Sequence, residues 1–320
     1  MPPLVSILIP VFNTRQWVGA AIDSALAQTW PDTEVIVLDD GSTDGSLDVV
    51  RAYAGRVRIH TQSNGGQNVS RNRLTEFSRG EWLVYLDADD ALANDAVGLK
   101  LAAADGADAV YGSMEVAHYR GDVCLRSEAF LAADYPDPFA AAFFWRYPNT
   151  SSFMFRRTAV TSVGGWNEGI RSCTDYDLYF RLLLANRVLR PAPRSLSVYR
   201  HWSDGQASIQ DAFRQTTTRL DLMWRAALAL DRAGRWTGAA RVAFGNAALG
   251  VIRILHVIDA DRAAAEFSRL RSWHPALQPA PPNFSAGYRA AFRLLGFRGA
   301  ERLADALRVL RPAPLPIVNR

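Results

Sequence analysis

Three carboxylates stand within four residues of one another at Asp87-Ala-Asp-Asp90, directly after an apolar run at residues 82–86. Carboxylates this close repel one another unless a cation or hydrogen-bond donors offset their charge. Hard oxygen ligands on one turn suit Mg²⁺ or Mn²⁺, held together with phosphate oxygens of a substrate. The motif therefore indicates a divalent-metal site; the alternative is a solvated loop that caps the following helix.

A second acidic motif, Asp39-Asp-Gly-Ser-Thr-Asp44, also follows an apolar run. The carboxylate of Asp40 could accept hydrogen bonds from a nucleobase N–H or from ribose hydroxyls, and Gly41 would allow close backbone approach. The alternative is a turn in which Ser42, Thr43 or Asp44 caps the next helix. Both interpretations can hold together, with Asp40 binding a ligand while a neighbour caps.

Three weaker signals accompany these motifs. Asn64-Gly-Gly precedes a helical pattern that carries Arg71, so backbone N–H groups and a guanidinium could bind an anion, although an ordinary tight turn reads the same way. Thr174-Asp-Tyr-Asp177 opens another helix, where acids are favoured by the helix dipole but could also supply a general base. His201 is a candidate metal ligand, or a histidine of the surface or core.

The elements around these motifs alternate regularly. Nearly continuous runs of Val, Ile and Leu suit parallel strands that are buried on both faces. Amphipathic segments between them complete the strand–helix–strand pattern of a doubly wound sheet, whose ligands bind at the carboxyl ends of the strands. We expect strands at residues 4–9, 34–38, 57–60 and 82–86, and helices at 15–28, 43–53 and 67–77.

The pattern changes along the rest of the chain. Strands are expected at 109–126, 152–155 and 196–199, and helices at 137–145 and 174–186, the latter with Thr174 as N-cap. After about residue 209 nothing strand-like remains, and Ala, Leu and Arg recur at helical spacing. The sequence thus predicts an α/β domain at 1–208 and a helical region at 209–320.

Composition narrows the class of protein. The chain has 320 residues, of which 49% are hydrophobic, and this excludes a disordered or fibrous protein. Its two cysteines exclude a disulfide framework or a cysteine-ligated zinc site. The first residues lack the basic segment of a signal peptide, and the apolar runs fall short of the roughly 18–20 residues that span a bilayer. We expect a cytoplasmic protein, at most peripheral at the inner face of the membrane.

Taken together the motifs resemble the family 2 inverting glycosyltransferases of the GT-A fold, over about residues 4–205. That fold is a mostly parallel central sheet flanked by helices, so the resemblance implies a catalytic domain at 1–208, with a donor-binding half at about 1–110 and an acceptor half at about 111–208. The matching segments are Ser6-Ile-Leu-Ile-Pro-Val-Phe-Asn13, Val37-Leu-Asp-Asp-Gly-Ser-Thr-Asp44, Asn64-Gly-Gly, Ser70-Arg-Asn72, Tyr85-Leu-Asp-Ala-Asp-Asp90, Gly164-Gly-Trp-Asn-Glu168 and Asp175-Tyr-Asp177.

The resemblance also implies roles for single residues. Asp175 matches the catalytic base, while Asp89 and His201 would hold Mn²⁺ or Mg²⁺ at the diphosphate. Asp40 would bind uracil or thymine, and Asp87 would contact the ribose. The implied donor-nucleotide residues are Pro10, Phe12, Asp40, Gly65, Arg71 and Asp87, and the secondary candidates are Asn13, Asp39, Asp90 and Asp177.

These roles imply one in-line displacement at the anomeric carbon of a UDP- or dTDP-sugar. One carboxylate takes the proton of the acceptor hydroxyl, and the metal offsets charge on the leaving diphosphate. The Gln-x-x-Arg-Trp element of processive synthases is missing, so we expect one sugar to be added to a glycan, lipid-linked or other acceptor. Thr174 stands where relatives commonly carry an acid, which leaves Asp177 as the alternative base.

Two other functions are alternatives to this one. A nucleotidyltransferase of similar sheet topology would want a glycine-rich basic loop after the first strand, and Pro10-Val-Phe-Asn13 lacks it. A non-catalytic nucleotide-sugar-binding module is the other alternative. Nucleic-acid binding is not expected, because no recognised module appears.

Charge divides the chain in the same place as the fold pattern. Residues 1–209 hold 19 basic and 24 acidic side chains, whereas residues 210–320 hold 17 basic and 8 acidic ones. The arginine-rich helices could face anionic lipid, as a peripheral membrane contact, or a polyanionic glycan. The alternative is a solvated helical surface without a partner.

Overall fold

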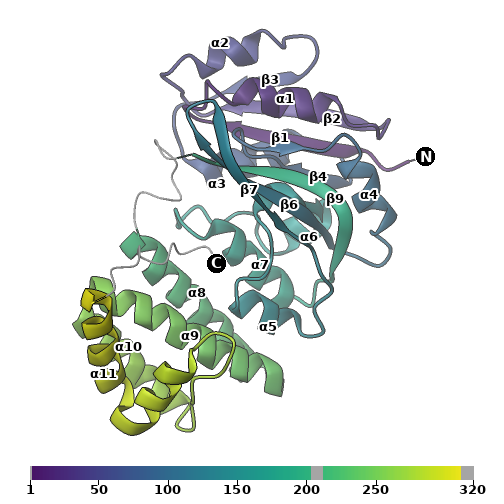
Figure 1. The fold of residues 1–320 in the computed structure, drawn as a ribbon. Helices are drawn as coiled ribbons and strands as arrows, with labels where there is room; N and C mark the ends of the chain where they lie inside the picture. The colour runs from purple at the N-terminus through teal and green to yellow at the C-terminus, as the bar shows by residue number, and fades with distance from the viewer. Residues whose placement is uncertain (1, 203–211, 311–320) are drawn as a thin grey trace. The chain divides into compact units, whose positions relative to one another are not determined.

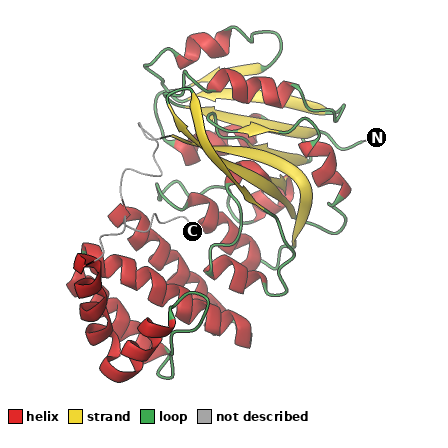
Figure 2. Cartoon of the chain, in the orientation of Figure 1, coloured by secondary structure: helices red, strands yellow, loops and turns green. Residues whose placement is uncertain are grey.

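The computed structural model describes residues 2–202 and 212–310, which form two compact units (Figure 1). Residues 2–138 and 147–202 make an α/β unit, and residues 139–146 and 212–310 make a helical one (Figure 2). The predicted boundary at residue 208 placed 139–146 in the first unit. In the structure Phe143 instead packs against Trp236 and Phe244, with ring centroids 6.0 and 5.3 Å away, because its aromatic partners belong to the helical unit.

A sheet of nine strands runs through the described part of the α/β unit in the order β3-β2-β1-β4-β8-β6-β9-β5, with β7 paired to β6. The half from β3 to β4 is parallel; β8 then runs antiparallel to both β4 and β6. The predicted α/β class is confirmed, with a mixed second half. The strands are β1 (Val5–Val11), β2 (Thr33–Asp39), β3 (Arg58–Thr61), β4 (Trp82–Tyr85), β5 (Ala91–Leu92), β6 (Ala109–Arg120), β7 (Val123–Phe130), β8 (Phe153–Arg156) and β9 (Leu189–Trp202).

Helices cover both faces of this sheet. Val5, Ile7 and Ile9 of β1 join a core cluster with Val18 and Ile22 of α1, whose buried residues recur at helical spacing. The other face carries α3 and α7, with Tyr179 stacked on Phe153 at 4.4 Å. The helices of this unit are α1 (Val18–Leu26), α2 (Ser46–Arg51), α3 (Gln67–Phe77), α4 (Ala96–Ala102), α6 (Arg157–Ser162) and α7 (Thr174–Leu184), with the 3₁₀ turn η1 (Thr150–Ser152).

The helix predictions succeed and fail for local reasons. The expected helix at 67–77 has the bounds of α3. The helices expected at 15–28 and 43–53 begin later than predicted, because the residues before them form hydrogen bonds between two loops. The N–H of Thr14 donates to Ser46 Oγ at 2.9 Å, and the N–H of Arg15 donates to Asp44 Oδ2 at 2.9 Å. The strand expected at 109–126 is a hairpin, because Gly121 turns the chain at a φ of 58°.

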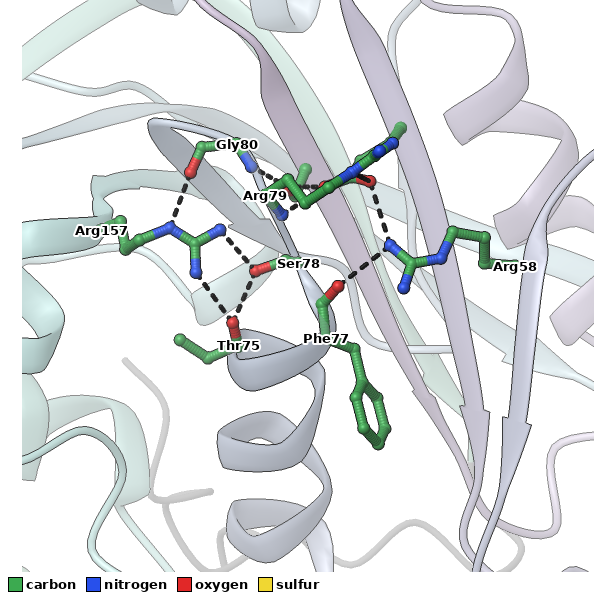
Figure 3. Close-up of polar contacts among 9 residues, drawn as sticks. Arg58, Thr75, Phe77, Ser78, Arg79, Gly80 and Arg157 are labelled. Atoms are coloured by element: carbon green, nitrogen blue, oxygen red, sulfur yellow. Dashed lines mark hydrogen bonds and ion pairs between the residues drawn. The ribbon is translucent and has the colours of Figure 1, made fainter.

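The C-terminal end of α3 is fixed by arginines from two other elements (Figure 3). Arg157 donates to the carbonyls of Thr75 and Gly80 at 2.9 and 2.8 Å, and Arg58 donates to the carbonyl of Phe77 at 2.9 Å. Carbonyls in the last turn of a helix lack partners within the helix, and cations there also favour the helix dipole. These contacts hold α3 in place, and its other end carries residues of the candidate site.

The helical unit packs around an aromatic core. Trp224, Phe244 and Trp273 meet with ring centroids 4.9 to 6.2 Å apart. Among the described residues, α9 is the one helix long and apolar enough to cross a membrane, yet more than half of it is buried in this unit, as in the central helix of a bundle. The helices are α5 (Pro138–Phe143), α8 (Ala212–Arg232), α9 (Gly238–Ile258), α10 (Ala260–Trp273) and α11 (Ala286–Leu310).

Candidate active site

Arg71 of α3 joins three of the predicted motifs. Its guanidinium is buried, with Nη2 2.6 Å from Asp87 Oδ1 and Nη1 donating to Thr174 Oγ1 at 3.2 Å. The same group lies over the ring of Trp166 at 4.3 Å. A buried cation needs such partners to offset its lost hydration. Arg71 therefore ties the end of β4 to the start of α7 and to the loop before it.

Asp40 is fully engaged by the loop that follows β3. Its Oδ1 accepts the N–H of Gly65 at 2.8 Å and Nε2 of Gln62 at 2.6 Å, and its Oδ2 accepts the N–H of Gly66 at 2.9 Å. The anion that these glycine N–H groups bind is thus a carboxylate of the protein itself. Gly41 makes the approach possible, because a Cβ there would lie 2.9 Å from the backbone nitrogen of Asn64.

The neighbouring Asp39 differs from Asp40 in one respect. Its side chain is buried at the last position of β2, where Oδ2 accepts the N–H of Ser42 at 3.2 Å. Its Oδ1 is buried without a hydrogen-bond partner in the described residues. A buried acceptor left unpaired costs free energy, so each one calls for an explanation such as a ligand or a water.

The loop after β1 supplies an exposed aromatic ring beside these acids. Pro10 is buried within β1, whereas Phe12 just beyond the strand is 47% exposed, unusual for so large an apolar side chain. Asn13 adopts a left-handed φ of 51° and accepts the N–H of Thr43 on Oδ1 at 2.8 Å. Asn13 therefore holds the loops after β1 and β2 together and leaves Phe12 projecting at the strand ends.

The three carboxylates after β4 have different surroundings. Asp90 is buried and accepts from Ser151 Oγ, Asn149 Nδ2 and the N–H of Arg200 at 2.6, 2.8 and 3.1 Å, and these hydrogen bonds tie the loop after β4 to η1 and β9. Burial, then the charges of Asp89 and Asp87, raise the pKa of the Asp90 carboxyl well above its usual value.

Asp87 and Asp89 are the carboxylates of this motif that fit a cation. Arg71 and Gln67 both donate to Asp87 Oδ1, and no described residue donates to its Oδ2. Asp89 Oδ2 accepts from Trp202 Nε1 at 3.0 Å. Two half-exposed carboxylates next to a third buried one concentrate negative charge on oxygen donors, and this donor set suits Mg²⁺ or Mn²⁺. In the described chain no three His, Cys, Asp or Glu side chains form a ready-made metal cluster.

The described residues do not bring His201 together with Asp89. Arg200 and Trp202 both contact Asp89, which places them on one face of β9. Successive side chains of a strand point to opposite faces, so His201 lies on the other face, where its ring centroid is 4.9 Å from that of His118. Period-two alternation along Arg200-His-Trp202 was the signal that could have identified Trp202 from the sequence.

The loop between α6 and α7 is fastened to α3 by two asparagines. Asn72 accepts the N–H of Trp166 on Oδ1 at 2.8 Å and donates to the carbonyl of Trp166 at 2.9 Å. Asn68 donates to the carbonyl of Asn167 at 2.6 Å. The sequence missed Asn68, although its spacing of four from Asn72 puts both on one face of a helix.

Asp175 and Asp177 both lie in the first turn of α7 but have different contacts. Asp177 is buried in a two-point ion pair with Arg181, 2.8 Å to Nε and 2.7 Å to Nη2. Asp175 Oδ1 accepts the N–H of Tyr176 at 2.9 Å, and no other described residue donates a hydrogen bond to its side chain. Burial raises the pKa of Asp175 against that hydrogen bond, and the charges of Arg71 and Asp87 also act on it. Asp175 is therefore the acid of this motif that lies beside the Arg71–Asp87 pair, and burial raises its pKa.

The start of α7 differs from its prediction. Thr174 was expected as the N-cap, but it is the first helical residue and its hydroxyl accepts from Arg71. The N-cap position is Cys173, with φ 53° and ψ 32°. Few non-glycine residues adopt this left-handed conformation, and such strain tends to persist at functional sites. The strained residue stands two positions before Asp175.

The chain matches a known protein family and several known proteins in sequence. The model of the family described as glycosyl transferase family 2 matches residues 6–171. A chondroitin synthase of Pasteurella multocida is 33% identical over 192 residues, covering 56% of this chain and 19% of that protein. A PGL/p-HBAD biosynthesis glycosyltransferase of Mycobacterium bovis is 31% identical over 187 residues, covering 56% of this chain and 69% of that protein. The chain thus spans about a fifth of the first relative and over two thirds of the second.

Solved structures match over nearly the whole chain. S. aureus TarS 1–349 superposes with a TM-score of 0.61 at 15% identity, over 96% of this chain and 92% of that one. A mannosyltransferase of Pyrobaculum calidifontis, solved with GDP-Man and Mn²⁺, superposes with a TM-score of 0.52 at 16% identity, over 98% and 88%. At such identities the likeness establishes a shared fold, that of the GT-A transferases.

Proposed function

The chain belongs to glycosyl transferase family 2, and from this premise we propose that it moves one sugar, with inversion, from a UDP- or dTDP-sugar to a hydroxyl of a glycan or lipid-linked acceptor. Membership of this family shows that the chain is a glycosyltransferase, whereas the donor, the stereochemistry and the metal are our proposal. One observation carries it. Arg71 joins Asp87, at the carboxyl end of β4, to the helix start that bears Asp175.

Asp175 is proposed to take the proton of the acceptor hydroxyl as the new glycosidic bond forms. Its raised pKa and its place beside the Arg71–Asp87 pair support this role. Asp177 is not proposed as the base, because its ion pair with Arg181 fixes its position and offsets its charge. A single displacement needs no covalent intermediate, so no nucleophilic side chain is required beyond this base.

The nucleobase is proposed to lie between Phe12 and the end of β2. Phe12 offers an exposed ring for stacking. Asp39 offers the unpaired Oδ1, whereas both oxygens of Asp40 already accept hydrogen bonds. One available carboxylate oxygen suits the single ring N–H of uracil or thymine. The base contact predicted for Asp40 is therefore proposed for Asp39, with Asp40 holding the glycine loop.

Asp89 and Asp87 are proposed to hold a divalent cation, while the hydrogen bonds of the buried Asp90 hold their loop in place. When bound, such an ion offsets the charge of the leaving diphosphate. The mannosyltransferase solved with GDP-Man and Mn²⁺ shares this fold and supports the expectation of a metal. His201 is not carried into this proposal, because it lies on the opposite face of β9 from the residues that contact Asp89.

The proposal is tested with a panel of UDP-, dTDP- and GDP-sugars, each with Mn²⁺, Mg²⁺ or a chelator. Binding is measured by calorimetry, nucleoside diphosphate release by a coupled assay, and the configuration of the product by NMR. We expect metal-dependent release from a uridine or thymidine donor and an inverted anomeric centre. A retained configuration, or turnover with GDP-sugars alone, would contradict the donor and mechanism proposed here. Donor binding without any turnover would instead favour the binding-module alternative.

A further inference from the structure

Helix α11 of the helical unit exposes large apolar side chains to water. Leu294 is 83% exposed and Leu295 58%, and both stand directly before Gly296. There the backbone leaves the helical conformation, with φ 66° and ψ −173°, so the two leucines lie at a kink. Leu303 and Leu307, four residues apart beyond the kink, are 46% and 55% exposed. Scattered single leucines need no explanation, but an exposed pair on each side of the kink does.

Both acids of α11 have a cationic or polar partner. Glu301 is buried against Arg253 at 2.7 Å, and the half-exposed Asp305 lies 3.2 Å from His256 Nε2. Arg293, Arg298 and Arg302 are exposed, and none forms an ion pair with a described residue. We call these three arginines and the four exposed leucines the α11 surface.

A second helix extends the apolar part of this surface. Val257 and Ile258 end α9 and are 44% and 42% exposed. They follow His256 directly, and the contact of His256 with Asp305 places the end of α9 beside the second half of α11. Apolar side chains from two helices therefore lie next to exposed arginines that form no ion pair with a described residue.

We propose that the α11 surface binds the surface of an anionic lipid bilayer. Leucines can enter the boundary between headgroups and acyl chains, while arginines bind the anionic headgroups. A soluble polyanion would be attracted by the arginines but would leave the leucines in water. A second copy of the chain would bring the same arginines against one another. The combination of exposed leucines and exposed arginines therefore fits a membrane better than either. The inference is independent of the donor and mechanism proposed above.

The test uses the full chain and two kinds of vesicle, one of phosphatidylcholine alone and one that also contains phosphatidylglycerol. Sedimentation is compared for wild type, for Arg293→Gln/Arg298→Gln/Arg302→Gln and for Leu294→Ser/Leu295→Ser. The matched control Arg51→Gln/Arg225→Gln/Arg232→Gln removes the same charge from exposed positions elsewhere. Since an arginine near an anionic surface changes partitioning about fivefold, the first triple variant should bind about a hundredfold more weakly.

Binding of wild type to the anionic vesicles only, lost in both α11 variants and largely kept in the control, supports the proposal. Equal losses in the two arginine triples, or no vesicle binding by wild type, would overturn it. A dimer in light scattering that the Leu294→Ser/Leu295→Ser variant dissociates would assign the surface to a second copy instead. Unchanged thermal unfolding of each variant shows that the comparison concerns binding and not folding.

Discussion

Replacing Arg71 by methionine removes its charge while keeping an apolar chain of similar length in the buried site. Asp87 would then retain only the amide of Gln67, at 3.2 Å, beside two other carboxylates. Breaking a buried ion pair from one side costs about 3–5 kcal/mol. Because the Asp87 side chain is 23% exposed, water can reach it, and we expect a loss of about 3 kcal/mol.

That loss corresponds to a melting temperature about 6–12 °C lower for a unit of this size. The measurement is urea unfolding followed by tryptophan fluorescence, since Trp166 lies against the substituted side chain. Arg51→Met is the matched control: its pair with Asp48 is exposed and should be worth less than about 1 kcal/mol. At a temperature where the Arg71 variant is folded, we also expect a raised KM for donor, because Asp87 is no longer held. If both variants unfold alike, Arg71 does not carry the charge balance described above.

Three further predictions concern single positions. Burial lowers the pKa of Lys100, the sole lysine, to about 7, so between pH 7 and its usual value of 10.5 the unfolded chain binds a proton that the folded chain lacks. Stability should therefore rise by about 2 kcal/mol from pH 7 to pH 9 in denaturant unfolding, and Lys100→Met should abolish that rise. Gly165→Ala should lower the melting temperature more than Gly164→Ala. Both glycines have a positive φ, but only at position 165 would a Cβ lie 2.7 Å from Asn72 Oδ1. Equal melting temperatures would refute the contact between Asn72 and the loop before α7. Asp39→Asn should raise donor KM about tenfold or more at little cost in stability, whereas Asp40→Asn should lower the melting temperature, and the reverse pattern would return the base contact to Asp40.

The sequence predicted the parallel half of the sheet well, because buried strands such as β1 and β2 are apolar throughout and need no partner to be recognised. It could not predict β5 or the mixed pairing of β8, since two- and four-residue strands are defined by their neighbours and not by their own pattern. Gly121 was visible as a glycine, but an uninterrupted strand-like run on both sides concealed the hairpin.

For the site, residue types and spacing identified which loops meet at the strand ends but not what each side chain contacts. Asp39 and Asp40 are adjacent and chemically identical, and only the glycine N–H groups that bind Asp40 distinguish them. Asp175 and Asp177 are likewise distinguished by a residue outside the motif, because Arg181, one helical turn after Asp177, forms an ion pair with Asp177. His201 illustrates the same limit on a strand, where one position decides which face a side chain occupies.

The central claim is that Asp175 is the base of a glycosyl transfer. The most direct test measures donor binding and sugar transfer for wild type and Asp175→Asn across pH, with Asp177→Asn as a control. We predict that Asp175→Asn binds donor as wild type does but transfers sugar at least about a hundredfold more slowly, in line with the usual contribution of a general base. Wild-type activity should fall with decreasing pH as Asp175 protonates, at a pH above the ordinary range of an aspartate because its pKa is raised by burial. Wild-type turnover in Asp175→Asn would contradict the assignment.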